Sequence, residues 1–188
     1  MNSATTLIYL MAKPGVGKYT IAKEIARNHS FIVCDNQLIN NPIFELLQYD
    51  GYASIPDFAW GCITEIRTAI FKFLMKEQLR SYVLTNCLAE TEKDRLLYDQ
   101  VKDIAETRGS LFVPVQLVIA KEEHLKRLTK PERKARWKSI DPQDAEDQGP
   151  LLSISHPNFL ELEVSNLSPN SAAARIMKHI QEVENLSS

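Results

Sequence analysis

Cysteine and glycine are scarce in this sequence of 188 residues, which has three of the first and six of the second. Cys34, Cys62 and Cys87 lack a C-x-x-C spacing and stand among apolar residues, so we expect buried, reduced thiols rather than a disulfide framework. No basic stretch followed by an apolar core opens the sequence, and the most apolar candidate for a membrane span, residues 69–75, is interrupted by Lys72. We therefore expect a cytoplasmic protein without a signal peptide or a membrane-spanning helix.

An excess of charge of one sign is also absent. The 22 basic and 24 acidic residues give a formal net charge of −2, so neither nucleic acid nor an anionic membrane is expected as a partner. The exception is a local basic run, which by itself is compatible with a solvated helix face. Its members are Arg127, Lys130, Arg133, Lys134, Arg136 and Lys138. At this length we expect a single domain, residues 1–188, with an ordinary apolar core.

The most informative part of the chain begins with a short apolar run, residues 7–11, which has the length of a buried strand. A turn that contains Gly15 and Gly17 follows this run. Apolar residues then recur at helical spacing, at Ile21, Ala22, Ile25 and Ala26. The pattern predicts a strand, a glycine-rich turn and a helix that begins near Lys18.

A strand–turn–helix junction of this kind suits phosphate groups, because backbone N–H groups converge there at the positive end of a helix dipole. The glycines of the turn let the backbone approach an anion, and Lys18 would reach the β- and γ-phosphates. The sequence departs from the consensus G-x-x-x-x-G-K-[ST] at Ala12 and Tyr19, and Thr20 stands one place later as the candidate hydroxyl ligand of Mg²⁺ or phosphate. The candidate nucleotide-binding residues are Gly15, Val16, Gly17, Lys18, Tyr19 and Thr20.

Strand-like and helix-like segments alternate along the rest of the chain. Further strands are expected at residues 31–35, 82–85, 112–120 and 159–164. Helices are expected at residues 56–80 and 91–108, from about residue 122, and from residue 168. This alternation predicts an α/β fold with a parallel sheet that helices cover on both faces. Residues 36–55 are not assigned, since Asn40-Asn41-Pro42 and Asp50-Gly51 are turn signals there.

Several polar residues follow the expected strands, and ligands of parallel sheets bind beyond the carboxyl ends of the strands. Asp35 ends the second strand and is either a substrate ligand and base or a turn former beside Asn36. Asn86 follows the third strand, where it could replace a metal-binding acid through a bridging water or merely end the strand. Arg67 falls on the apolar side of its helix, so it should meet an acid or an anionic ligand unless its head reaches the rim.

With these parts in this order, the chain resembles the small P-loop kinases of the nucleoside/nucleotide-kinase superfamily, such as shikimate, gluconate and adenylate kinases. The spacing Gly17-Lys18-Tyr19-Thr20 is similar to that of adenylate kinase, where the Thr also comes second after the Lys. The resemblance implies a three-layer α/β/α P-loop fold with a five-stranded parallel sheet in the order 2-3-1-4-5. It also implies ATP and Mg²⁺, an acceptor-binding segment at about residues 36–80 and a short lid at about residues 121–150.

The resemblance also assigns roles on the acceptor side. Asp35 matches the carboxylate that binds or activates the acceptor hydroxyl, and together with Thr20 it would organise Mg²⁺. Arg67 lies on the helix that carries a substrate-binding Arg in shikimate kinase. The glycine-rich turn that shikimate kinases show after the third strand is absent here, which argues against shikimate itself. Gluconate-like and nucleoside-like acceptors both remain open, and Ile55-Pro56-Asp57 is similar to gluconate kinase.

On the donor side, the resemblance implies that one Arg of the lid stacks on adenine and another stabilises the transferring phosphoryl group. By position, Arg127 matches the Arg that stacks on adenine. Either Arg133 or Arg136 matches the Arg that stabilises the phosphoryl group. Asn166 and Pro169 follow the fifth strand, where relatives hold adenine. Ser168 as a helix N-cap and Pro169 at the first helical position would explain that stretch without a ligand.

We therefore expect ATP-dependent phosphoryl transfer to a hydroxyl, or a phosphate, of a small-molecule acceptor. One alternative is a polynucleotide 5′-end kinase that uses the basic run as a backbone track. Another is an ATP-binding module without transfer activity, which the departures at Ala12, Tyr19 and Asn86 would favour.

Overall fold

Five parallel strands form the centre of the fold, in the order β2-β3-β1-β4-β5. The computed structural model describes residues 5–51, 53–128 and 149–186. The strands are β1 (Thr6–Met11), β2 (Phe31–Cys34), β3 (Ser81–Asn86), β4 (Leu111–Val118) and β5 (Leu160–Glu163). The expected parallel sheet and its strand order are confirmed.

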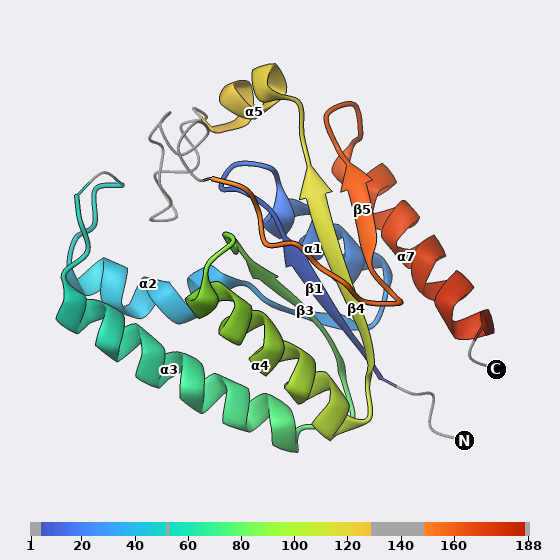
Figure 1. Ribbon diagram of the computed structural model, residues 1–188, viewed down its shortest axis with the longest axis horizontal. Coiled ribbons are helices and arrows are strands. Elements are labelled where there is room, and N and C mark those ends of the chain that lie inside the picture. The colour runs from blue at the N-terminus through green and yellow to red at the C-terminus, as the bar shows by residue number, and fades with distance from the viewer. Residues whose placement is uncertain (1–4, 52, 129–148, 187–188) are drawn as a thin grey trace.

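Helices cover both faces of the sheet. Those described are α1 (Lys18–Asn28), α2 (Asn36–Leu46), α3 (Asp57–Lys76), α4 (Glu92–Arg108), α5 (Lys121–Leu128) and α7 (Pro169–Leu186). α1 and α7 lie on one face of the sheet and α3 and α4 on the other (Figure 1). Ile8 and Leu10 of β1 pack in one core cluster with residues of α1 and α7, whereas Leu7 and Tyr9 pack in another with residues of α3 and α4. Because successive side chains of a strand point to opposite faces, β1 serves both clusters, and all of its residues are buried. The three-layer α/β/α arrangement is confirmed.

The turn expected at Asn40-Asn41-Pro42 is wrong, because α2 runs through these residues. Ile39 and Phe44 of this helix pack against Ile63 of α3 in a small apolar cluster of their own. This burial favours the helix although Pro42 cannot donate an intrahelical hydrogen bond. Tertiary packing therefore overrides the local turn signal.

The expected helix at residues 56–80 is also too long, since α3 ends at Lys76 and Glu77 is extended. Buried Arg108 explains this end, because its guanidinium donates to the carbonyl oxygens of Leu74 (2.7 Å), Glu77 and Arg80 (2.5 Å). These carbonyls lie at or just beyond the end of α3, where backbone acceptors have no intrahelical partner. One side chain thus joins the ends of α3 and α4 to the start of β3.

The cysteines form no disulfide, but their expected burial is only partly correct: Cys34 is buried, Cys87 is half-buried and Cys62 is exposed on α3. Burial, followed by the neighbouring Asp35, raises the pKa of the Cys34 thiol to about 11. In the described part of the chain, no helix combines the length and the apolar character that crossing a membrane requires.

Replacing Arg108 by Met should lower the free energy of unfolding by about 2–4 kcal/mol, because buried carbonyl groups lose their donor. Urea denaturation followed by circular dichroism measures this change. Arg175→Met, at an exposed position of α7, is the matched control and should alter stability by less than about 0.5 kcal/mol. Equal effects of the two substitutions would contradict the role given to Arg108.

Candidate functional site

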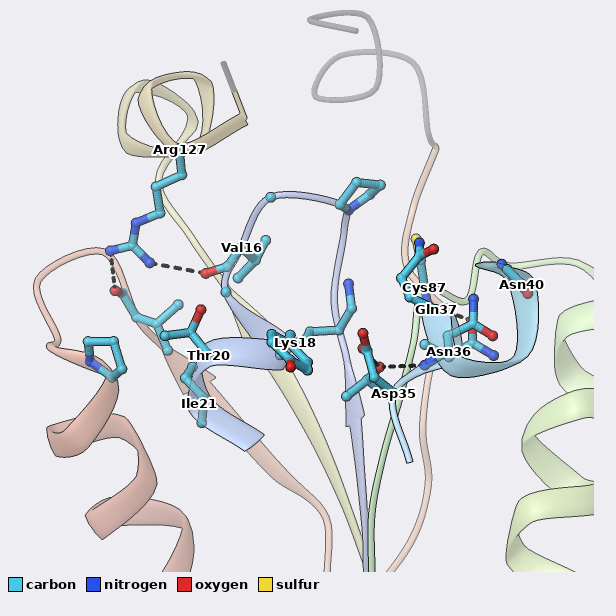
Figure 2. A pocket seen from close by; sticks show the side chains of 18 of the residues that line it. Val16, Lys18, Thr20, Ile21, Asp35, Asn36, Gln37, Asn40, Cys87 and Arg127 are labelled. Carbon is cyan, nitrogen blue, oxygen red and sulfur yellow. Dashed lines mark hydrogen bonds between the residues drawn. The ribbon is translucent and has the colours of Figure 1, made fainter. Parts of the chain in front are cut away.

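A cleft of about 730 Å³ opens at the carboxyl ends of the strands. The turn after β1 and the first turns of α1 form one side, and the end of β2 with α2 forms another. The end of β3, one face of α5 and the segment between β5 and α7 complete the lining (Figure 2). This is the edge of a parallel sheet at which ligands bind, so the expected location of the site is occupied by a cavity of ligand size.

The turn between β1 and α1 has the backbone geometry that an anion-binding loop requires. Gly15 and Gly17 have φ values of 87° and 117°, in the left-handed region that favours glycine. Gly17 is the N-cap of α1 and its carbonyl accepts the first helical hydrogen bond, from Ile21 N at 3.0 Å. The first turn of α1 contains no acidic residue, so no carboxylate there competes with a bound anion.

Lys18 lies in the first turn of α1 and lines the cleft. Its Nζ donates to the carbonyl oxygens of Ala12 (2.7 Å) and Lys13 (3.0 Å), so the ammonium group lies within the curl of the loop. Ala12 is fully buried and its N–H donates to Asn86 O at 3.2 Å, which extends the sheet by one residue. An alanine therefore fits at this place of the loop.

Asp35 lines the same cleft from the end of β2, and only 6% of its surface is exposed. The hydroxyl of Thr85 donates to Asp35 Oδ1 at 2.5 Å and accepts a hydrogen bond from Asn36 N at 3.1 Å. Thr85 thereby fixes both the carboxylate and the first residue of α2. The structure thus brings Lys18 and Asp35, which are 17 positions apart in the sequence, to one cavity.

Thr20 and Tyr19 also line the cleft, and Thr20 is exposed on α1. Within the described residues there is no group of three or more His, Cys, Asp or Glu side chains that could hold a metal ion alone. Mg²⁺ does not require such a group, because it retains waters and binds substrate phosphates with one or two protein oxygens. The Thr20 hydroxyl and the Asp35 carboxylate therefore fit Mg²⁺ bound together with a nucleotide.

Arg127 lies where α5 meets the turn between β1 and α1, and it lines the cleft. Its guanidinium donates to Val16 O at 3.1 Å (Figure 2). It donates to Val164 O and Ser165 O as well, at 3.0 Å each. It also forms an ion pair with Glu123 at 2.7 Å. Arg127 thus joins the loop to the segment after β5, beside the expected nucleotide site. Whether it also stacks on adenine stays a prediction.

His124, which was not among the residues predicted from the sequence, contributes to the same junction. This buried residue has Nε2 at 2.5 Å from Pro14 O, and Leu128 packs within contact distance of Gly15. His124, Arg127 and Leu128 therefore contact three consecutive residues of the loop. Their spacing of i, i+3 and i+4 on α5 places them on one helix face, which is a signal that the sequence does contain.

Arg67 does not line the cleft. It lies in a smaller cavity whose walls include Asn36, Thr85 and Asn86, residues that also line the cleft. The Nε atom of Arg67 is buried without a hydrogen-bond partner, and burial lowers the pKa of the guanidinium. Its role in acceptor binding stays a prediction, and any direct contact would require this shared wall to open.

Asn86 uses its amide within the protein: Nδ2 donates to the hydroxyl of Tyr9 at 3.2 Å, and Oδ1 accepts from Cys87 N at 2.9 Å. Burial raises the pKa of the Tyr9 hydroxyl, so it remains protonated at neutral pH. These contacts favour the reading in which Asn86 ends the strand.

The remaining expected residues differ in their outcome. Pro169 lines the cleft at the start of α7, whereas Asn166 does not. The hydroxyl of Ser168 accepts a hydrogen bond from Ser171 N at 3.1 Å, as expected for an N-cap. Arg133 and Arg136 lie outside the described residues, as does most of the expected lid.

Comparisons with family models and with curated proteins find no match. Among solved structures, a gluconokinase from Sinorhizobium meliloti is 15% identical, with a TM-score of 0.62 over 97% of this chain and 95% of its own. The Mycobacterium tuberculosis APS kinase in complex with AMPPNP and APS is 14% identical, with a TM-score of 0.58 over 95% and 98% of the two chains. A shikimate kinase from Acinetobacter baumannii in complex with shikimate is 16% identical, with a TM-score of 0.51 over 95% and 94%. The chain therefore has the fold of the P-loop small-molecule kinases.

Proposed function

We propose that this protein is an ATP-dependent phosphotransferase that acts on a hydroxyl group of a small molecule. The observation that carries the proposal is the position of Lys18 and Asp35, which reach one cleft from two different strand ends. Lys18 lies in a loop whose backbone suits phosphate, and the Asp35 carboxylate is buried and oriented by Thr85. A phosphate-binding loop facing an oriented carboxylate is the arrangement that transfer to a hydroxyl needs.

Each residue has a distinct part in this proposal. The amides of residues 15–20 and the Lys18 ammonium would hold the β- and γ-phosphates, with Lys18 exchanging its bonds to backbone carbonyls for phosphate oxygens. Thr20 and Asp35 would hold Mg²⁺, which neutralises charge on the phosphates when it is bound. Asp35 would also accept the hydrogen bond of the acceptor hydroxyl and so orient its oxygen toward the phosphate. Arg127, with Pro169, would border the nucleotide.

The structural neighbours support the type of reaction without fixing the acceptor. Their names refer to gluconate, APS and shikimate, which are different small molecules on one fold. A nucleotide-binding module without transfer activity is the second candidate. It is favoured by Asn86, whose amide is engaged by Tyr9 and Cys87 and supplies no carboxylate for a metal.

The central test is ADP release in the presence of ATP, Mg²⁺ and a panel of hydroxylated acceptors. Lys18→Ala should lower kcat/KM by about 100-fold or more, because a charge that stabilises the transferred phosphoryl group is removed. Asp35→Asn should lower kcat by a similar factor, of about 100-fold, because the carboxylate that orients the acceptor hydroxyl and holds Mg²⁺ is lost. Lys72→Ala, at an exposed position of α3, is the control and should behave as the wild type. Suppose that ADP release does not depend on the acceptor and is equally fast in the wild type and the three variants. This result would contradict transfer activity and favour the nucleotide-binding module.

Arg127→Met should raise the Kd for ATP about tenfold, because the loop loses a charged donor that holds it against the segment after β5. Isothermal titration calorimetry with a non-hydrolysable ATP analogue measures this constant. Lys126→Met is the matched control, since Lys126 is the preceding residue of α5 and is exposed. An equal loss of affinity in both variants would show that net charge, rather than this junction, controls binding.

Arg67→Met should raise the acceptor KM about tenfold and leave the KM for ATP within about twofold, because Arg67 lies behind the acceptor side of the cleft. Steady-state kinetics with each substrate varied in turn separates the two constants. An unchanged acceptor KM would assign Arg67 a purely structural role.

A further inference from the structure

The acceptor side of the cleft is formed by one face of α2. Asn36, Asn40 and Phe44 recur at intervals of four residues, which places them on one stripe of the helix, and Gln37 lies beside the first of them. All four residues line the cleft next to Asp35. Figure 2 shows Asn36, Gln37 and Asn40 on the side of the cleft that carries Asp35. Neutral amides thus lie on the same side of the cleft as the carboxylate, and the aromatic ring of Phe44 lies one turn of α2 beyond Asn40.

Two of these amides have buried oxygen atoms without a hydrogen-bond partner, Asn40 Oδ1 and Gln37 Oε1. Asn40 is 5% exposed, so it is a well-buried polar side chain in the wall of the cleft. A buried acceptor that lacks a donor destabilises the protein unless a ligand or water supplies one. The acceptor side is therefore suited to a ligand that carries N–H or O–H donors.

Beyond the amides, three aromatic rings border the cleft. The centroid of the Phe44 ring lies 5.0 Å from that of Tyr49 and 6.0 Å from that of Trp60, which comes from α3. Phe44 is buried, but Trp60 is 39% exposed. An exposed indole at the edge of a cleft provides a surface on which a flat ring can stack.

The charges of the described residues that line the cleft argue against an anionic acceptor. Among the described residues that line it, the basic side chains are Lys18 and Arg127, and both belong to the phosphate side. The lining residues described between positions 36 and 60 include none, and the buried Asp35 carboxylate next to them would repel a second anion. The nearby Arg67 lies in the adjoining cavity.

From these observations we infer that the acceptor is an uncharged, nucleoside-like molecule: a flat heterocycle with N–H donors, joined to a sugar that bears a hydroxyl. An Asn or Gln amide presents an acceptor and a donor side by side, which matches the edge of a nucleobase. Gln37 and Asn40 would bind that edge, and Trp60 would stack on the ring. This inference rests on the proposed function and specifies its acceptor.

In the proposed transfer, the bond that forms is matched by a bond that breaks. The sugar hydroxyl oxygen forms a bond to the γ-phosphorus of ATP as the bond between that phosphorus and the ADP oxygen breaks. The hydroxyl proton passes to Asp35 and then to solvent, and the products are ADP and a phosphomonoester of the sugar.

Binding can be tested without turnover, because Trp60 is one of only two tryptophans in the sequence. In a Trp137→Phe variant, Trp60 is the only indole, and a stacked base should quench its fluorescence. Adenosine, guanosine, cytidine and thymidine are the uncharged probes, and gluconate and shikimate are the anionic ones. We expect saturable quenching by at least one nucleoside and none by the two anions.

Two nearly isosteric substitutions assign the contact. In the Trp137→Phe background, Asn40→Leu and Gln37→Met should each raise the nucleoside Kd about tenfold or more. Each substitution removes an amide that would hydrogen-bond to the edge of the base. Gln181→Met, at an exposed position of α7, is the matched control and should leave the Kd unchanged. The ATP affinity of every variant is measured as a check that the fold is retained. If Asn40→Leu does not fold, Gln37→Met provides the test, because Gln37 is less buried than Asn40.

Several outcomes would overturn the inference. Quenching by none of the nucleosides would do so. So would saturable binding of an anion that Arg67→Met abolishes and Asn40→Leu does not affect. ADP release with that anion would keep the proposed kinase activity while removing the nucleoside-like acceptor. Conversely, nucleoside binding that depends on Asn40, without ADP release for any acceptor, would overturn the kinase activity and retain the assignment of this wall.

Discussion

The side of the cleft that we propose for the acceptor depends on the hydroxyl group of Thr85. It donates to the Asp35 carboxylate at 2.5 Å and accepts from the N–H of Asn36 at 3.1 Å. The parallel pairing of Cys34 with Leu84 aligns the ends of β2 and β3, so that Thr85 lies beside Asp35. Because the same oxygen holds the carboxylate and the first residue of α2, the direction of that helix and the orientation of the carboxylate are set together.

The side of the cleft that we propose for the phosphates is coupled to the same strand. β3 lies between β2 and β1 in the sheet, and its last residue, Asn86, pairs with Met11 and accepts from the N–H of Ala12. The loop that begins at Ala12 is held from the other side by α5, through the contacts of His124 and Arg127. The spacing between Lys18 and Asp35 is therefore a property of the sheet, with α5 as a second support for the loop.

The sequence alone predicts those features of the cleft that depend on neighbouring residues in the chain. Lys18 and Asp35 could be predicted because each directly follows an apolar run or a glycine-rich turn, and strand ends of a parallel sheet share one edge. α2 could not be predicted, because its amphipathic face becomes favourable only when Ile39 and Phe44 meet Ile63 on another helix. The amide wall that α2 carries was missed for the same reason.

The departures from the phosphate-loop consensus also become clear in the structure. Ala12 is fully buried as the last hydrogen-bonded position of the extended β1 strand, so a Cβ is accommodated there and the curl begins after it. Tyr19 lines the cleft with its ring 5.6 Å from the Lys23 ammonium, and the hydroxyl of Thr20 reaches the same cavity from the next position. Of the consensus groups, Gly17 at positive φ and Lys18 are retained, and a hydroxyl stands one position later. Gly15, also at positive φ, is an additional glycine of the turn. The loop therefore differs from the consensus in the position of its hydroxyl and in one methyl group, and not in the groups that an anion would contact.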